Sequence, residues 1–159
     1  MEESPRVVVQ EAPFDFAEEY QRLKSVSLKV GATVTFIGTV RDLNEGDEVA
    51  GLRLEHYPGM TEKEISGIID EAEERWDVIA ATVIHRIGDL FPGDEIVFAG
   101  VSSQHRGDAF QACQFIMDYL KTRATFWKKE TTEGGDRWLT TRQSDIDIAA
   151  SWRASDSAD

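Results

Sequence analysis

The stretch VIAATVIHRIGDLFPGDEIVFAGVS, residues 78–102, determines the fold that we expect for this chain. Its two halves are rich in β-branched and aromatic residues, and the segment between them contains Pro92-Gly93. This pattern predicts two strands, Val78–Ile87 and Glu95–Ser102, joined by a turn at Gly88–Asp94. A β-sheet is therefore part of the expected structure.

Helical patterns lie on both sides of these strands. Thr61 and Glu64 have the spacing of a capping box, and the residues after them predict a helix because their apolar side chains recur every three or four positions. A second helix is expected from about Asp108 to Arg123. Its buried stripe is expected to consist of Phe110, Cys113, Met117 and Leu120.

The remaining segments complete a mixed pattern. Asp15 and Glu18 predict a capped helix over Phe16–Lys24. Further strands are expected at Val30–Val40, Gly51–Tyr57, Thr125–Thr131 and Arg137–Thr141. We therefore expect one α+β domain over residues 1–153, followed by a small, acidic and disordered tail at residues 154–159.

Composition excludes several classes of protein. The 159 residues include 17 Lys and Arg against 30 Asp and Glu, a net charge of −13, which disfavours binding to nucleic acid or to an anionic membrane. No apolar run is long enough to span a bilayer, and the acidic N-terminus MEESPRVVVQ does not have the pattern of a secretory signal. The expected location is the cytoplasm. The single cysteine, Cys113, and the widely spaced histidines predict no metal site.

One segment departs from the acidic balance. Ser102–Glu130 contains five basic residues. Arg106 follows His105 just before the start of the expected helix, and Lys121 lies near the end of that helix. A helix start beside a guanidinium favours a phosphate or carboxylate. If Lys128 lies on a strand that returns from the helix, it can approach Lys121, and two close ammonium groups lower each other's pKa. A solvated basic face and an ordinary polar turn remain the alternatives at this point, and Cys113 is expected to be a buried, unreactive thiol.

Four runs of the sequence resemble the large, catalytic subunit of molybdopterin synthase. They are VTFIGTVR (Val34–Arg41), LEHYPGM (Leu54–Met60), VIHRIGDLFPGDEIVFAGVSSQHR (Val83–Arg106) and FIMDYLKTRATFWKKE (Phe115–Glu130). The similarity extends from about Val7 to Trp152. Two departures are Thr125, where the family frequently has proline, and the Gly134-Gly135 turn, which varies among relatives.

The resemblance implies a fold and a reaction. The fold is an α/β hammerhead-like domain with a small additional antiparallel β subdomain. Members of the family convert cyclic pyranopterin monophosphate to molybdopterin by installing two sulfurs as a dithiolene. The sulfur is carried as a thiocarboxylate on the C-terminal Gly-Gly of a small ubiquitin-like partner subunit, so no cofactor is implied. The family forms a central homodimer with one small subunit at each end, a 2:2 heterotetramer.

The resemblance also implies roles for individual residues. Lys121 matches the principal catalytic lysine of the family, and Lys128 matches its second essential lysine. Substrate contacts are implied for Thr39, Val40, Arg41, His105, Arg106, Lys129, Glu130 and Arg142. Arg106 is expected to act across the dimer interface.

Two other functions compete with this one on the sequence alone. The first is a non-catalytic module that uses its basic segment to bind a protein tail or a phosphorylated ligand. The second is a stand-alone phosphate-ester enzyme with Lys121 as its base. An assay for the dithiolene product separates both from the sulfurtransferase.

Overall fold

The computed structural model describes residues 6–44 and 46–156, and it contains two β-sheets. The first sheet has four strands, and only its β1–β5 pair is parallel. In spatial order these strands are β1 (Val7–Gln10), β5 (Ala80–Arg86), β7 (Glu95–Ser103) and β2 (Ala32–Thr39). The two strands expected within residues 78–102 are thus confirmed as the neighbours β5 and β7.

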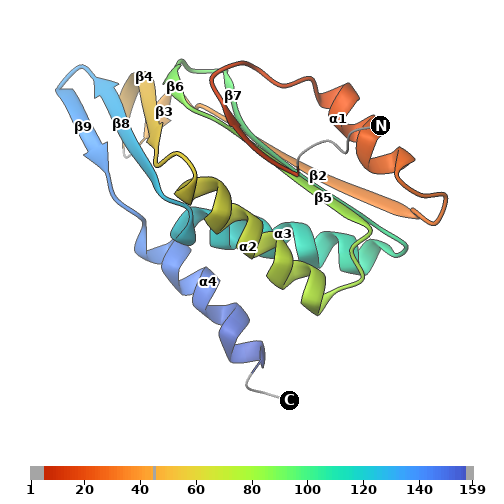
Figure 1. Ribbon diagram of the computed structural model, residues 1–159. Coiled ribbons are helices and arrows are strands. Elements are labelled where there is room, and N and C mark those ends of the chain that lie inside the picture. Colours follow the sequence, from red (N-terminus) through yellow and green to blue (C-terminus); the bar gives the residue numbers. More distant parts are fainter. Residues whose placement is uncertain (1–5, 45, 157–159) are drawn as a thin grey trace.

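Helices cover both faces of this sheet, as Figure 1 shows. One face carries α1 (Phe16–Ser25), and the other carries α2 (Met60–Arg75) and α3 (Arg106–Arg123). On β7, Phe98 packs in the cluster of α1, whereas Val97, Ala99 and Val101 pack in the cluster of α2 and α3. A strand covered on both faces has apolar residues in succession, because both sets of alternate side chains are buried.

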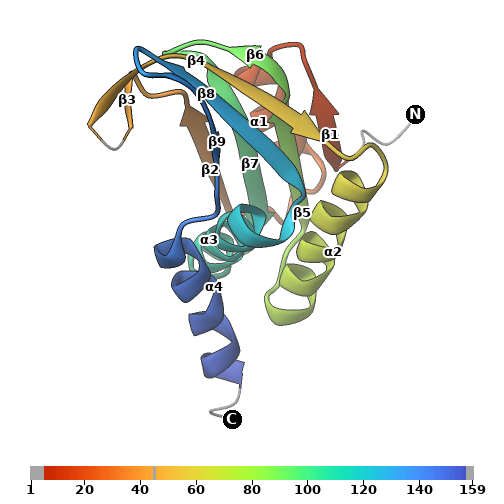
Figure 2. The ribbon, with the colours of Figure 1, turned by 90° about the vertical axis from the view of Figure 1, so that its left-hand side faces the viewer.

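The second sheet is smaller and antiparallel. Its strands are β3 (Leu43–Asn44), β4 (Asp47–His56), β8 (Phe126–Thr132) and β9 (Gly135–Leu139), and β6 (Gly88–Leu90) also pairs with β4. In Figure 2 the long strands β4 and β8 lie side by side above the end of α3. The expected α+β class with an additional antiparallel sheet is confirmed.

A fourth helix, α4 (Gln143–Asp156), follows β9 and was not predicted from the sequence. It is docked on α3 through Trp152, whose ring lies 5.5 Å from that of Phe115 and whose Nε1 donates a hydrogen bond of 2.8 Å to Asp118. The tail was expected to begin at residue 154, but the helix continues to Asp156. Residues 157–159 lie outside the described part of the chain.

Three predicted details of the helices can be compared with the structure, and one of them is confirmed. Asp15 caps α1 as expected, since its side chain accepts a hydrogen bond of 3.0 Å from the amide of Glu18. Phe110, however, is 61% exposed, because the buried stripe of α3 begins at Ala109 and places residue 110 one position off that face. The expected capping box of α2 was also wrong, because the carboxylate that reaches back to the helix start is that of Glu62, which binds the amide of Gly59.

In the part of the chain that the structure describes, we find no helix that is long and apolar enough to cross a membrane.

Candidate active site

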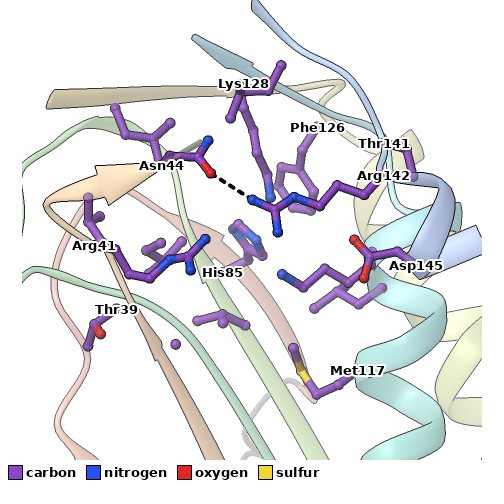
Figure 3. A pocket seen from close by; sticks show the side chains of 18 of the residues that line it. Thr39, Arg41, Asn44, His85, Met117, Phe126, Lys128, Thr141, Arg142 and Asp145 are labelled. Atoms are coloured by element: carbon purple, nitrogen blue, oxygen red, sulfur yellow. Dashed lines mark hydrogen bonds between the residues drawn. The ribbon is translucent and has the colours of Figure 1, made fainter. Parts of the chain in front are cut away.

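A cavity of about 540 Å³ opens where the two sheets meet the end of α3. Figure 3 shows it from close by. The end of β2, the inner face of β8, the last turns of α3 and the start of α4 supply its walls. Elements that are far apart in the sequence therefore converge on one space.

The cavity brings together the two lysines that the sequence singled out. Lys121 lies in the last turn of α3 and Lys128 lies on β8, and both line the cavity. Between the two lysines, the backbone of Ala124 has an extended conformation, with φ −80° and ψ 131°, and the helix ends there. The expectation that Lys128 lies on a strand returning from the helix is confirmed.

Thr125 fixes this turn to the start of α2. Its carbonyl oxygen accepts a hydrogen bond of 2.8 Å from the hydroxyl of Thr61, and its own hydroxyl donates one of 2.5 Å to the carboxylate of Glu64. Thr61 is fully buried, so this contact is shielded from water. Thr61 and Glu64, which were expected to form a capping box, therefore hold the connection between Lys121 and Lys128 instead.

The environment of Lys128 favours its neutral form. The pKa of this lysine is lowered from 10.5 to about 8, and burial is the main cause of the shift. The charges of Lys121 and Arg142 contribute to this lowering of the pKa, whereas the carboxylate of Asp145 opposes it. Near neutral pH, a fraction of Lys128 is therefore unprotonated and can act as a base or a nucleophile.

A hydrogen-bonded network holds the rim of the cavity. The buried carboxylate of Glu130 accepts hydrogen bonds from the side chains of Asn44 and, at 3.4 Å, Arg137. The side-chain oxygen of Asn44 in turn accepts a hydrogen bond of 2.7 Å from Arg142, drawn as a dashed line in Figure 3. Arg142 thus joins the cavity through Asn44, a residue that the sequence analysis did not identify.

The end of β2 and the two residues after it form the wall beside this network. Thr39, Val40 and Arg41 all line the cavity, and Figure 3 shows the guanidinium of Arg41 on the side of His85. The amide of Val40 donates a hydrogen bond of 2.9 Å to the carbonyl of Asp94, and its carbonyl accepts one of 2.9 Å from the amide of Gly93. The amide of Val40 is therefore already hydrogen-bonded within the protein, whereas the guanidinium of Arg41 carries a positive charge that can bind an anion.

Two aromatic rings form a flat wall inside the cavity. His85 on β5 stacks on Phe126 on β8, with 3.9 Å between the ring centroids and 21° between the planes. The pKa of His85 is lowered to about 3, mainly by burial and also by the charges of Lys128 and Lys121, whereas the hydrogen bond to the carbonyl of Arg86 opposes this shift. His85 is thus neutral at physiological pH. The sequence analysis considered it only as a structural residue.

Three of the predicted site residues lie outside this cavity. His105 caps α3 and Arg106 begins it, fifteen residues before Lys121, which is about 22 Å along a helix. Lys129 lies 3.9 Å from the carboxylate of Asp136 and 5.5 Å from the centroid of the Trp138 ring. Within one chain, His105 and Arg106 do not reach Lys121, and the side chain of Lys129 lies on the face of β8 opposite to that of Lys128.

Cys113 takes no part in the cavity. It is buried on the sheet-facing side of α3, and burial raises the pKa of its thiol to about 11. Its sulfur lies 3.7 Å from the carbonyl oxygen of Ala99. Such a thiol is not a nucleophile at neutral pH.

Comparisons with known proteins agree with one another on the kind of protein that this is. A relative from Vibrio cholerae, named molybdopterin synthase catalytic subunit, is 58% identical over 147 residues, which are 92% of this chain and 97% of the relative. The solved structure of the molybdopterin biosynthesis MoaE protein from Burkholderia ambifaria is 47% identical, with a TM-score of 0.81 over 94% of this chain and 98% of that one.

A more distant likeness concerns the fold alone. A chain in the complex of subunits 1 and 2 of the molybdopterin-converting factor from Helicobacter pylori is 18% identical, with a TM-score of 0.70 over 87% of this chain and 92% of that chain. The family model described as MoaE protein matches residues 9–123. This chain therefore belongs to the MoaE protein family.

Proposed function

We propose that this protein is the catalytic subunit of a molybdopterin synthase, which converts cyclic pyranopterin monophosphate to molybdopterin in the biosynthesis of the molybdenum cofactor. The observation that carries the proposal is the cavity with two lysines at the end of α3, one of which has a pKa of about 8. Curated relatives that are 58% identical over 92% of this chain are named as the catalytic subunit of this enzyme.

The groups in the cavity suit the two ligands of this reaction. The substrate carries a phosphate and the sulfur donor ends in a thiocarboxylate, so both are anions, and Lys121, Lys128 and Arg41 provide positive charge. We assign Lys121 to the donor tail and to catalysis, and Lys128 to the proton transfers that accompany attack by sulfur. A neutral lysine can accept such a proton, and a fully charged one cannot.

The sulfur comes from the partner and not from this chain. The product contains two new sulfurs and each donor tail carries one, so two tails are consumed for each product. Each tail ends as a carboxylate when water has supplied the oxygen that replaces the sulfur. A buried and protonated Cys113 is compatible with this scheme, because the scheme requires no thiol of the catalytic subunit. No cofactor is proposed.

We further propose that the protein forms a homodimer that binds one small ubiquitin-like subunit at each end. His105 and Arg106 are about 22 Å from Lys121 along α3, so they can reach a cavity only if it belongs to another subunit. Phe110, which is 61% exposed one helical turn beyond Arg106, supplies apolar surface for such a contact. We also propose that the assembly is located in the cytoplasm, since relatives are molybdopterin synthase catalytic subunits and a net charge of −13 disfavours contact with an anionic membrane.

The assembly has a direct test. Light scattering is expected to give a dimer for the protein alone and a 2:2 complex after addition of the small subunit. Removal of the last two glycines of the partner is expected to abolish sulfur transfer and to weaken binding far less, because two residues without side chains contribute little contact area. A monomer that remains monomeric with its partner would contradict the 2:2 arrangement.

The function itself is tested by product formation. The purified protein is mixed with thiocarboxylated small subunit and cyclic pyranopterin monophosphate, and the dithiolene product is measured. The proposal predicts product, with two donor tails consumed for each molecule. Absence of product with a donor that is active with another MoaE protein would refute the assignment and favour a non-catalytic binding module.

A further inference from the structure

His85 provides the cavity with a hydrogen-bond acceptor that the protein itself does not use. Its Nδ1 lies 2.9 Å from the carbonyl oxygen of Arg86. A carbonyl oxygen can only accept a hydrogen bond, so Nδ1 must carry the proton. In a neutral imidazole the other nitrogen, Nε2, then has a free lone pair and can only accept.

The structure leaves this lone pair open to a ligand. His85 lines the cavity, and no hydrogen bond of Nε2 is found within the described residues. Lys121 and Lys128 influence His85 electrostatically, yet neither ammonium group is hydrogen-bonded to it. Nε2 is not among the fully buried side-chain atoms that lack a hydrogen-bond partner, so it is accessible from the cavity, and a bound molecule with an N–H group can donate to it.

The ring is also held in a fixed orientation. Stacking on Phe126 at 3.9 Å sets the plane of the imidazole, and the contact with Arg86 sets its rotation within that plane. Figure 3 shows His85 between Arg41 and Phe126, in a cavity whose lining contains four cations and two carboxylates. The cations attract a phosphate, whereas the lone pair of His85 Nε2 repels it. The cations are therefore expected to bind the phosphate of a ligand, and Nε2 is expected to bind a different part of the same ligand.

We propose that His85 is a specificity-determining residue that orients the substrate, with Nε2 accepting a hydrogen bond from the N3–H or the 2-amino group of the pterin ring. This inference rests on the proposed function, because it takes the ligand to be a pterin phosphate. It assigns the heterocycle to the wall formed by His85 and Phe126, and the phosphate to the cations.

The test uses a matched pair of variants. The side-chain oxygen of His85→Gln can take the place of Nε2, whereas the shorter side chain of His85→Asn can replace only the group at Nδ1. Both are uncharged amides, so differences in folding are small, and thermal unfolding of each variant checks this. The ligands are 6-carboxypterin, which joins a pterin ring to an anionic group, and its 3-methyl and 2-desamino analogues, measured by fluorescence titration.

The expected result is a difference in selectivity. The wild-type chain and His85→Gln are expected to bind 6-carboxypterin about tenfold more tightly than at least one analogue, because the analogue lacks the donor and leaves Nε2 unpaired. His85→Asn is expected to bind all three ligands with similar affinity. With the full substrate, His85→Asn is expected to raise KM more than it lowers kcat.

Two results would overturn the inference. One is a His85→Asn variant that discriminates among the three ligands as the wild-type chain does. The other is a wild-type preparation that forms the dithiolene product but does not bind 6-carboxypterin. In both cases the proposed function stands if product is formed, whereas a wild-type chain that forms no product refutes the function itself.

Discussion

Replacement of Lys128 by methionine is expected to stabilise the folded protein, and to do so only below a defined pH. The wild-type lysine has a pKa of about 8 in the folded chain, against an ordinary value of 10.5. At about 1.4 kcal/mol for each pKa unit, this difference corresponds to at most about 3–4 kcal/mol, and water in the half-buried site reduces it. Methionine has a similar length and no charge, so it removes this penalty.

The sign of the pH dependence follows from proton binding. Between pH 8 and pH 10.5 the unfolded chain holds a proton on Lys128 that the folded chain has released, so the wild-type protein gains stability as the pH rises. Below pH 8 the whole penalty is present, and above pH 10.5 it is absent. Lys128→Met is therefore expected to be more stable than wild type by about 2–3 kcal/mol at pH 7, and the excess disappears by about pH 11.

The assay is urea unfolding of the wild-type protein and the variant from pH 7 to pH 11, with the difference in unfolding free energy as the readout. The matched control is Lys63→Met, because Lys63 is an exposed lysine on α2. The control is expected to show no comparable change between pH 8 and pH 10.5. A difference for Lys128→Met that is independent of pH, or a loss of stability at pH 7, would refute the argument that burial holds this lysine near neutrality.

Three further predictions concern other parts of the molecule. Arg106→Ala is expected to raise the KM for the pterin more than Arg106→Lys in steady-state assays, since a guanidinium binds a phosphate through two donors; equal effects would mean that Arg106 supplies only diffuse charge. Thr125→Pro is expected to change the unfolding free energy in urea by less than about 1 kcal/mol, because the lost hydrogen bond to Glu64 is offset by a less flexible unfolded chain. Ala124 already has the extended conformation that the residue before a proline adopts. A loss of unfolding free energy above about 2 kcal/mol would contradict this prediction. Cys113 is expected to resist a thiol reagent at pH 7 in the folded protein and to react after unfolding, and rapid labelling of the folded form would show that it is less buried than the structure has it.

Much of the fold could be predicted from local sequence patterns. The alternation and turn residues within residues 78–102 were sufficient for β5 and β7, and the spacing of apolar residues was sufficient for α2 and α3. Helix α4 was missed because its large apolar residues, Ile146, Ile148 and Trp152, do not recur at helical spacing, and several of its other residues favour caps and turns. Its position depends on the docking of Trp152, which is a tertiary contact.

Some residues of the candidate site could likewise be identified from the sequence, and others could not. Lys121 and Lys128 were identified because a cluster of bases is unusual in so acidic a chain. Asn44 and His85 could not be found in this way, since their roles arise from partners that are distant in the sequence, Arg142 for one and Phe126 for the other. His105 and Arg106 are near Lys121 in the sequence, but the length of α3 separates them.

The central claim is that Lys121 in this cavity carries the transfer of sulfur, and one measurement tests it most directly. Wild-type protein and Lys121→Ala are each given thiocarboxylated small subunit and cyclic pyranopterin monophosphate, and dithiolene product is measured alongside binding of the small subunit. We predict product from the wild-type protein and none from Lys121→Ala, with folding and partner binding retained, because a lysine at a helix end contributes only about 0.3–1 kcal/mol to stability. Near-normal product formation by Lys121→Ala would contradict the account.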